Sequence, residues 1–329
     1  MSLFFYDGSQ IELAIIGSMM ASIGFSGSLV FYDAFMPEIA TVDMHDKISA
    51  RGYSFGYVGS VLLLVLNLVM ISKHDLFGIE SEQMAMRISF LMVGLWWISF
   101  SQIPFKRLPQ QERKNAGSGN YLVSGYKELG KVLNQVAKLR DMRIYLVSYF
   151  FSNTGVQTVI LLASTFASKV IGMEGASLII VILIIQLVAI LGAHLFARVS
   201  GKIGNKNALL ILLVIWIGIC FAAYLTHSQN QFYIVAVVVG LVMGGIQSLS
   251  RATFSKLIPT DSPDHASFFS FYDVTYYISV VLGTFSYGFV EQLTNDMRLN
   301  TLVMASFFII GFVFLLFLRF DFKKQGEAQ

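Results

Sequence analysis

The sequence predicts an all-α, polytopic membrane protein with about nine transmembrane helices. Of its 329 residues, 55% are hydrophobic and only 13% are charged, and the mean hydropathy is +0.67. The apolar residues form runs of about 20, which is the length that a helix needs to cross about 30 Å of hydrocarbon. Soluble domains carry about 25% charged residues. The composition therefore excludes a soluble fold.

Nine hydrophobic segments define the expected helices. All five prolines fall at or beyond the ends of these segments, where the proline ring does not interrupt the backbone hydrogen bonds. The placement of the prolines therefore supports these boundaries. The expected spans cover approximately residues 11–35, 52–72, 87–105, 144–168, 176–197, 207–226, 232–254, 266–290 and 299–319.

The longest connection between spans is basic and separates three helices from six. The expected organisation is a partial N-terminal helix bundle at 1–105, a cytoplasmic linker at 106–143 and a six-helix bundle at 144–329. An amphipathic helix in the linker is compatible with a simple solvated tether and with a regulatory role. The flexible part of the linker contains Gly117, Ser118, Gly119 and Asn120, whereas its helical pattern consists of Leu122, Tyr126, Leu129, Val132 and Val136.

The positions of basic residues predict the orientation in the membrane. Cytoplasmic connections retain Lys and Arg, and a cytoplasmic C-terminus leaves all but four of the 23 basic residues inside. The four on the outer side are Lys73, Arg87, Lys169 and Arg298. Nine crossings then place the N-terminus of this chain outside. A bacterial inner membrane is the expected location.

Several functional classes are excluded by the absence of their motifs. The sequence has no zinc-ligand spacing, no phosphate-binding loop and no basic segment interleaved with aromatic residues. No metal, cofactor or nucleic-acid partner is therefore expected. Cys220 is the single cysteine, so no intrachain disulfide can form. The N-terminus lacks the features of a secretory signal and resembles part of a loop.

Two hairpins in the sequence are similar to each other. One exits a helix at Pro37 and continues into Asp46-Lys47-Ile48-Ser49, and the other exits at Pro259 and continues into Asp264-His265-Ala266-Ser267. Repeated halves are typical of many transporters. If the hairpins are equivalent, the basic linker separates two halves and the first half is three helices short.

Four segments carry a resemblance to a known family. They are GFSGSLVFYDAFMPEIA (24–40), SNTGVQTVILLAS (152–164), ARVSGKIGNKNALL (197–210) and GGIQSLSRATFSKLIP (244–259). Together they resemble the vacuole-effluxer branch of the major facilitator superfamily, whose best-known member exports amino acids from the yeast vacuole. The resemblance covers about residues 11–320 and implies a major facilitator helical bundle. It also implies that this chain corresponds to helices four to twelve of twelve.

The third segment resembles the second copy of the superfamily's cytoplasmic gating motif. The resemblance assigns Arg198, Lys202, Gly204 and Lys206 to this gating loop. The family usually has an acidic residue where this chain has Gly201, so we expect the corresponding ion pair to be absent from this half. The segment 271–284 also lacks a lysine and a Gly-Pro pair that relatives usually carry. This difference weakens any assignment of the family's substrate to this chain.

Polar side chains within the spans are candidates for solute binding, because they are costly in a membrane unless they face a cavity or a partner. Asn153 and Gln157 lie one helical turn apart, and so do Gln247 and Arg251. The amides are suited to hydrogen bonding with a polar solute or to holding helices together. Arg251 is suited to binding a carboxylate or to anchoring at the interface. Gln186 is an isolated amide, either facing a cavity or packed.

Asp273 is the candidate proton-coupling residue. It lies about two turns into its predicted span, and Tyr276 and Tyr277 share its face. Desolvation there would favour the neutral acid, as coupling to protons requires. The alternative is an acid capped by tyrosine hydroxyls near the interface, with Tyr276 and Tyr277 otherwise available to the solute. Asp33 and Glu38 are expected to be structural residues at the cytoplasmic interface.

The leading functional prediction is a secondary active transporter of a small organic solute, with amino acids suggested by the resemblance and protons as the coupling ion to consider. Its partners would be the lipid bilayer and the solute. A non-transporting scaffold or receptor, or an inactive truncated carrier, is the main alternative. An intramembrane serine protease is a remote one, because Gly24-Phe25-Ser26-Gly27 matches a GxSG pattern and His194 lies in another span. Close helix packing explains these small residues better.

Overall fold

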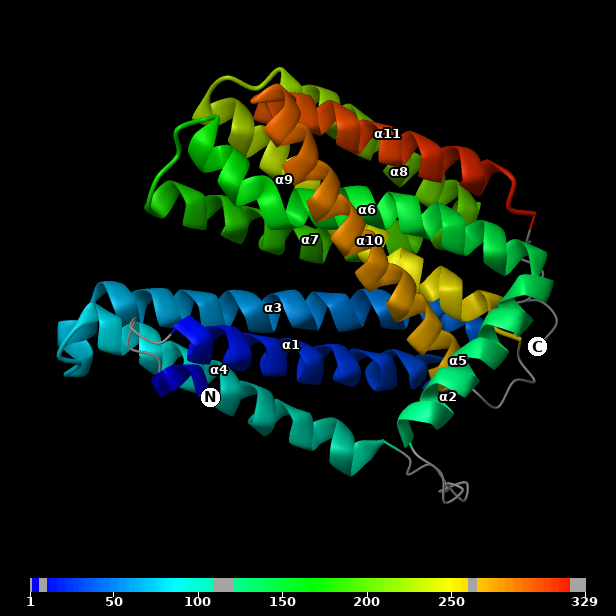
Figure 1. The fold of residues 1–329 in the computed structure, drawn as a ribbon, viewed down its shortest axis with the longest axis horizontal. Coiled ribbons are helices and arrows are strands. Elements are labelled where there is room, and N and C mark those ends of the chain that lie inside the picture. Colours follow the sequence, from blue (N-terminus) through cyan, green and yellow to red (C-terminus); the bar gives the residue numbers. More distant parts are fainter. Residues whose placement is uncertain (1, 6–10, 109–120, 260–264, 320–329) are drawn as a thin grey trace. The chain divides into compact units, whose positions relative to one another are not determined.

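The structure is a computed structural model that describes residues 2–5, 11–108, 121–259 and 265–319. Within these ranges the chain is helical and contains no strand (Figure 1). The helices are α1 (Ile11–Ala34), α2 (Met36–Ile39), α3 (His45–Ser72), α4 (Glu82–Arg107), α5 (Tyr121–Lys138), α6 (Arg140–Lys169), α7 (Ala176–Ile203), α8 (Asn205–Tyr224), α9 (Gln229–Leu257), α10 (His265–Thr294) and α11 (Met297–Leu316), with short 3-10 helices at Ser2–Phe5, Val42–Met44 and His74–Phe77.

Eight helical segments of the described chain are long and apolar enough to cross a membrane. The helices α1 and α2 form one of them, Ile11–Ile39. The remaining expected span, 266–290, corresponds to α10, which has 30 residues, carries Asp273 and several tyrosines, and is not one of the eight. The all-α, polytopic membrane fold is therefore confirmed.

Side-chain caps fix the starts of two membrane helices. Ser228 accepts a hydrogen bond from the backbone N–H of Gln231, and the Gln231 side chain accepts one from the backbone N–H of Ser228. This reciprocal capping box satisfies N–H groups that would otherwise have no partner at the start of α9. Ser81 caps α4 in a simpler way, by accepting from the N–H of Met84.

The described chain divides into two compact units. The first unit contains Met1–Leu29 and Gly59–Gly125, and the second contains Val30–Val58 and Tyr126–Gln329. In the first unit the Phe25 and Trp97 rings pack edge to face, with centroids 5.6 Å apart. The division of the chain at residues 105 and 143 remains a prediction.

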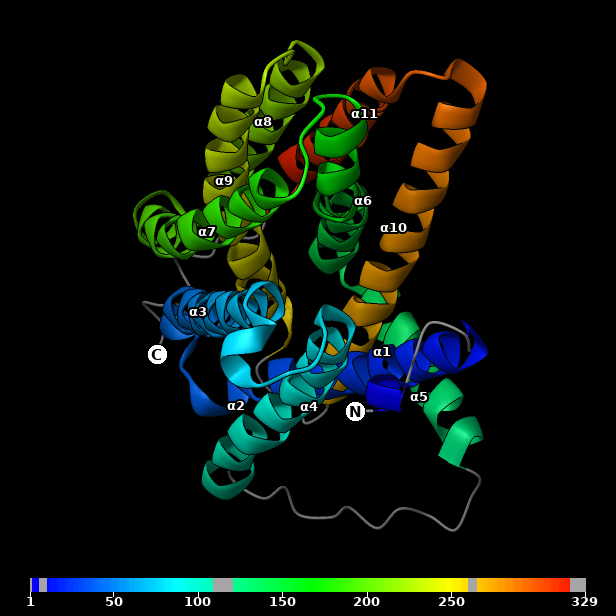
Figure 2. The same cartoon turned by 90° about the vertical axis from the view of Figure 1, so that its left-hand side faces the viewer.

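The second unit holds the main hydrophobic core. In it α6 packs against α10 and α11, α8 packs against α9 and α11, and α7 packs against α9 (Figures 1 and 2). Trp216 of α8 stacks on Phe308 of α11 with ring centroids 5.2 Å apart, and both side chains are fully buried. Stacked aromatic pairs of this kind add about 0.5–1.5 kcal/mol to the burial of their area.

Glycines allow α7 and α9 to approach closely. A Cβ atom on Gly240 would lie 2.6 Å from the carbonyl oxygen of Ile185, and one on Gly192 or Gly244 would overlap the backbone of the opposite helix. Only glycine fits at these three positions. Small residues at helix contacts are typical of membrane proteins, where they let two backbones pack directly.

Gly24 and Gly27, which flank Ser26, do not show such packing. A Cβ atom on either glycine would meet no atom within 4 Å. The close helix packing that we expected at this pair is therefore not present in the described part of the chain, and the expectation is corrected.

The helix predicted in the basic linker is present as α5. Val132 and Val136 are buried in the core of the second unit, whereas Tyr126 and Lys127 are exposed. This distribution agrees with an amphipathic helix whose apolar face packs on protein. Residues Gly117 to Asn120 of the predicted flexible segment lie outside the described residues.

Candidate functional site

Arg251 of α9 is buried and forms an ion pair with Asp33 near the end of α1. Its guanidinium donates to Asp33 over 2.7 Å, to the hydroxyl of Ser49 over 3.0 Å and to the backbone carbonyl of Ser49 over 3.0 Å. Arg251 is 6% exposed and Asp33 is 8% exposed. A buried charge is tolerated only with a partner and with its hydrogen bonds satisfied. These three bonds meet that condition for Arg251.

Tyrosine rings cover the guanidinium of Arg251. It lies 4.6 Å from the ring centroid of Tyr53 and 5.2 Å from that of Tyr32, within the range of cation–π attraction. Gly52 leaves the necessary space, because a Cβ atom there would be 3.0 Å from the guanidinium and closer still to the Tyr32 hydroxyl. Residues of α1 and α3 thus form a fitted pocket for one arginine of α9.

A second buried ion pair lies one turn further along α9. Lys256 is 2.8 Å from a carboxylate oxygen of Asp46 at the start of α3. Asn205 donates to the same carboxylate over 2.7 Å, and Ser200 donates to its other oxygen over 2.7 Å. Lys256 also donates to the side-chain carbonyl of Asn205 over 2.9 Å. Both charges are therefore enclosed in a connected polar network.

The residues of the predicted gating loop differ in the contacts that they make. Arg198 and Lys202 are exposed, and Lys206 binds the C-terminal carbonyls of α11, at 2.8 Å from Leu316 and 2.6 Å from Leu318. Gly204 connects α7 to α8 with a positive φ of 84°, which favours glycine. The neutral residues Ser200 and Asn205 of this loop bind Asp46 instead. The loop therefore borders an ion pair although it lacks an acid of its own.

The predicted amides of α6 are brought together with α10. Asn153 donates to the Ser279 hydroxyl over 2.6 Å, Ser279 donates to the Tyr276 carbonyl over 2.6 Å, and Gln157 donates to Asn153 over 3.2 Å. Asn153 and Gln157 are each 6% exposed. In this structure the amides hold two helices together, as the packing alternative expected, and the role in binding solute remains a prediction.

Asp273 has one carboxylate oxygen without a partner. Among the described residues, nothing donates a hydrogen bond to its buried Oδ2 atom. The tyrosine caps of the alternative interpretation are not present in the described chain, where the rings of Tyr276 and Tyr277 pack edge to face with centroids 5.0 Å apart. Asp273 is thus an under-bonded acid of α10.

The remaining candidate amides differ in their surroundings. Gln247 accepts a hydrogen bond from the Tyr57 hydroxyl of α3, so it joins the same two groups of helices as Arg251. The side-chain oxygen of Gln186 is buried without a hydrogen-bond partner in the described chain. Glu38 is exposed, whereas Asp33 is buried in its ion pair with Arg251, and the expected place of both residues at the cytoplasmic interface remains a prediction.

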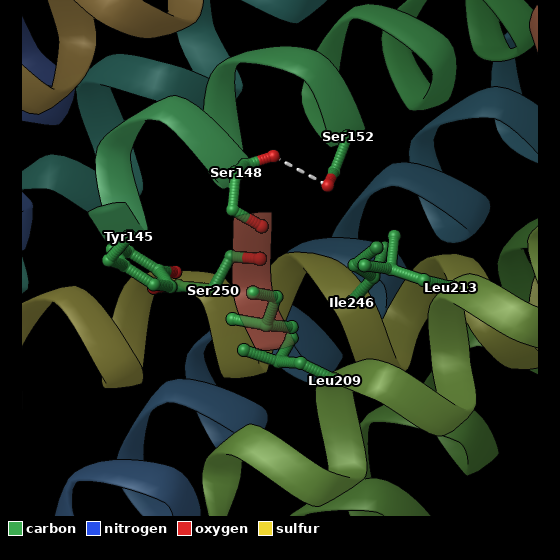
Figure 3. Close-up of a pocket in the computed structure, with 8 residues that line it drawn as sticks. Tyr145, Ser148, Ser152, Leu209, Leu213, Ile246 and Ser250 are labelled. Carbon is green, nitrogen blue, oxygen red and sulfur yellow. Dashed lines mark hydrogen bonds between the residues drawn. The ribbon is translucent and has the colours of Figure 1, made fainter. Parts of the chain in front are cut away.

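A small void lies beneath the candidate site, between α6, α8 and α9. Figure 3 shows Tyr145, Ser148 and Ser250 around it, where Tyr145 donates to the Ser250 carbonyl over 2.7 Å. The void measures about 10 Å³. One water needs about 10–15 Å³, so this space is too small for an organic solute.

The two ion pairs and the polar contacts around them could not be identified from spacing alone. Asp46 and Asn205 are 159 residues apart in the chain. In the sequence, Asp46 and Lys256 lie in predicted connections between spans, where charged residues are common. The similarity of the two hairpins was the only sequence signal that pointed to the Asp46 segment. The contact with Lys256 becomes visible only when α3 and α9 are placed together.

The geometry defines a class of protein: a polytopic helical membrane protein in which helices of the two predicted halves are joined by buried ion pairs. The chain belongs to the vacuole effluxer Atg22-like family, because residues 1–328 match the sequence model of that family. It is 28% identical over 329 residues to the uncharacterized MFS-type transporter YxiO of Bacillus subtilis (strain 168), covering 99% of this chain and 76% of that protein. It is 28% identical over 288 residues to autophagy-related protein 22 of Kluyveromyces lactis, covering 80% of this chain and 56% of that protein.

Solved structures confirm the fold. An Escherichia coli fucose:proton symporter, FucP, matches with a TM-score of 0.69 at 14% identity, over 97% of this chain and 81% of that chain. A bacterial homologue of the iron transporter ferroportin, in an outward-facing state, matches with a TM-score of 0.58 at 12% identity, over 93% and 72%. The fold is that of a major facilitator transporter. The family and these neighbours are transporters and not enzymes, so the serine-protease alternative is dropped.

Proposed function

We propose that this protein is a secondary active transporter that moves a small polar solute by alternating access. The relative from Bacillus subtilis supports a bacterial cytoplasmic membrane as its location, and the positions of the basic residues support a cytoplasmic C-terminus. In that orientation the Asp33–Arg251 and Asp46–Lys256 pairs lie toward the cytoplasmic side. These pairs are the observation that carries the proposal, because they join α1 and α3 of the first predicted half to α9 of the second.

The energetics of buried ion pairs suit a contact that forms in one state and separates in another. Removal of one partner from such a pair costs about 3–5 kcal/mol, because the other charge stays buried alone. When both partners separate into water, each charge is hydrated again and this cost does not arise. A closed cytoplasmic side also agrees with the outward-facing states of two of the structural neighbours.

The solute class is proposed from the polar groups that the membrane helices carry. Asn153, Gln157 and Gln247 offer neutral donors and acceptors, and Asp273 offers a carboxyl group. Such a set is suited to a zwitterion, which presents one ammonium and one carboxylate. Amino acids are therefore the substrate class to test first. Protons are the coupling ion to test first, supported by Asp273 and by the fucose:proton symporter.

The proposal can be tested by transport assays on the full-length protein in proteoliposomes. We expect accumulation of at least one labelled amino acid under an inward proton gradient. The second pair would be replaced by apolar residues, Asp46→Leu with Lys256→Met. These side chains can still touch each other, but they gain no charge hydration when α3 and α9 separate, so the separated state is disfavoured. The initial uptake rate should fall about tenfold, equivalent to about 1.4 kcal/mol in the barrier.

A matched control and two contrary outcomes make this test specific. Lys47 is exposed beside Asp46, so Lys47→Met removes a charge from the same segment and should leave uptake unchanged. Uptake by the apolar pair equal to that of the unmodified protein would contradict the role of the ion pair. Folded protein that transports no amino acid would instead favour another solute class or a non-transporting scaffold.

A further inference from the structure

A second cavity lies inside the second unit, among α6, α8, α9, α10 and α11. It measures about 80 Å³, and about 650 Å³ when its open mouth is included. Its walls are formed almost entirely by apolar side chains such as Phe166, Cys220, Phe232 and Met304. One water needs about 10–15 Å³ and about two to four polar partners. These walls offer so few polar partners that the space suits a hydrocarbon group better than water.

Four polar side chains interrupt the apolar lining, and two of them, Thr158 and Thr301, donate to backbone carbonyls of their own helices. Asn300 of α11 is fully buried, and neither its amide nitrogen nor its amide oxygen has a hydrogen-bond partner in the described chain. The Tyr287 hydroxyl of α10 is also buried, and Asn300 is the partner it can reach in the described chain. A single amide can donate two hydrogen bonds and accept two. Even a bond between these two residues would leave most of the capacity of Asn300 unused.

Unpaired buried polar groups are rare in native proteins, because each costs about 1–3 kcal/mol. A ligand with a hydrogen-bonding group would remove this cost. No charged side chain lines the cavity, so the ligand's polar group should be uncharged. A hydroxyl group can donate to the Asn300 oxygen and accept from the Asn300 nitrogen or from Tyr287.

We propose that this cavity binds a neutral aliphatic alcohol from the membrane, with its hydroxyl group on Asn300 and Tyr287 and its hydrocarbon chain against the apolar walls. The cavity is separate from the candidate transport site. None of Arg251, Asp33, Asp273 or Asp46 lines it. Binding here is therefore independent of whether amino acids are transported.

Photolabelling tests the proposal directly. The full-length protein in phosphatidylcholine nanodiscs would be irradiated with decanol that carries a diazirine on its chain, and labelled peptides would be located by mass spectrometry. We expect saturable labelling of peptides that contain Cys220 and Met304. Excess decanol should reduce the labelling at least fivefold, whereas decane, which lacks the hydroxyl, should not.

Three variants separate specific binding from contact with bulk lipid. Asn300→Leu should weaken competition by decanol about tenfold, and Tyr287→Phe, which retains the ring, should weaken it less. Ser306→Leu removes a hydroxyl from an exposed position of the same helix and should behave like the unmodified protein. Labelling that does not saturate, equal competition by decane, or unchanged competition in both cavity variants would each overturn the proposal.

Discussion

Arg251 illustrates how a residue's role depends on shape as well as charge. Its three guanidinium nitrogens contact Asp33 and Ser49 in different directions, while Tyr53 covers the planar face. A lysine could supply the charge but neither the fork of donors nor the flat stacking surface. The structure thus assigns Arg251 to a contact between helices in this conformation. Its roles in binding a solute carboxylate and as an interfacial anchor remain predictions.

Asp273 leads to a prediction at the same scale. Asp273→Asn preserves the side chain's shape but cannot bind or release a proton. We expect a proton gradient to stop driving accumulation of solute, while exchange of labelled for unlabelled solute continues. The measurement is uptake with and without a pH gradient in proteoliposomes of the full-length protein.

The control for this prediction is another aspartate. Asp296 caps the start of α11 by accepting from the backbone N–H of Arg298 over 2.8 Å. Because asparagine caps helices about as well as aspartate, Asp296→Asn should leave accumulation unchanged. Full gradient-driven accumulation by Asp273→Asn would show that Asp273 is a structural acid.

At the residue scale, sequence reasoning identified the polar positions but not their partners. Asn153, Gln157 and Gln247 were selected correctly as polar groups in membrane helices, and each makes a buried contact. Their partners Ser279 and Tyr57 were not selected. A polar residue is visible in a sequence, whereas the distance between two helices depends on tertiary packing. Partners across helices therefore need a structure.

At the scale of whole helices, hydropathy located each span and underestimated the length of most of them. The spans expected at 52–72 and 232–254 are parts of α3 (His45–Ser72) and α9 (Gln229–Leu257). Hydropathy marks only the part of a helix that lies in hydrocarbon. The backbone hydrogen bonds continue into the polar residues beyond it. Those added turns contain Asp46, Ser49 and Lys256, so the missed contacts and the missed turns have one cause.

The crossing of α7 and α9 supports a prediction for a helix pair. Gly244→Ala would place a Cβ atom into the backbone of Ala189. We expect a loss of about 1–3 kcal/mol in stability, as for other overpacked cores. Gly218→Ala on α8 is the matched control, because a Cβ atom there meets nothing within 4 Å. Thermal unfolding of both variants in one detergent measures the difference, and equal midpoints would disprove the role of the crossing.

At the scale of the whole molecule, the boundaries predicted from the sequence differ from those of the two compact units. The sequence suggested boundaries at the basic linker, because composition changes there. The compact units instead group Val30–Val58 with the helices that follow the linker. The cause is the set of buried contacts made by Asp33, Asp46 and Ser49. These contacts, rather than the position of the basic linker, group Val30–Val58 with the later helices.

Orientation in the membrane gives a prediction for the entire chain. In a Cys220→Ala background, Ser118→Cys should not react with an impermeant maleimide added to intact cells, because the basic linker is predicted to be cytoplasmic. Asp75→Cys should react, since its exposed side chain lies in a predicted outer loop. Permeabilised cells should label both positions. Strong labelling at position 118 in intact cells would reverse the orientation.

The short length of α8 links the second ion pair to the thickness of the surrounding bilayer. The 20 residues of α8 extend about 30 Å, which matches the hydrocarbon layer, so its first residue, Asn205, marks one edge of that layer. Asn205 binds both Asp46 and Lys256. With α8 spanning the layer in this way, we expect this ion pair at the hydrocarbon boundary, where charges cost less than at the bilayer centre. Lipids with longer acyl chains make a thicker hydrocarbon layer, which would enclose the Asp46–Lys256 pair. Separation of the two charges would then be less favourable, so transport should slow as the bilayer thickens.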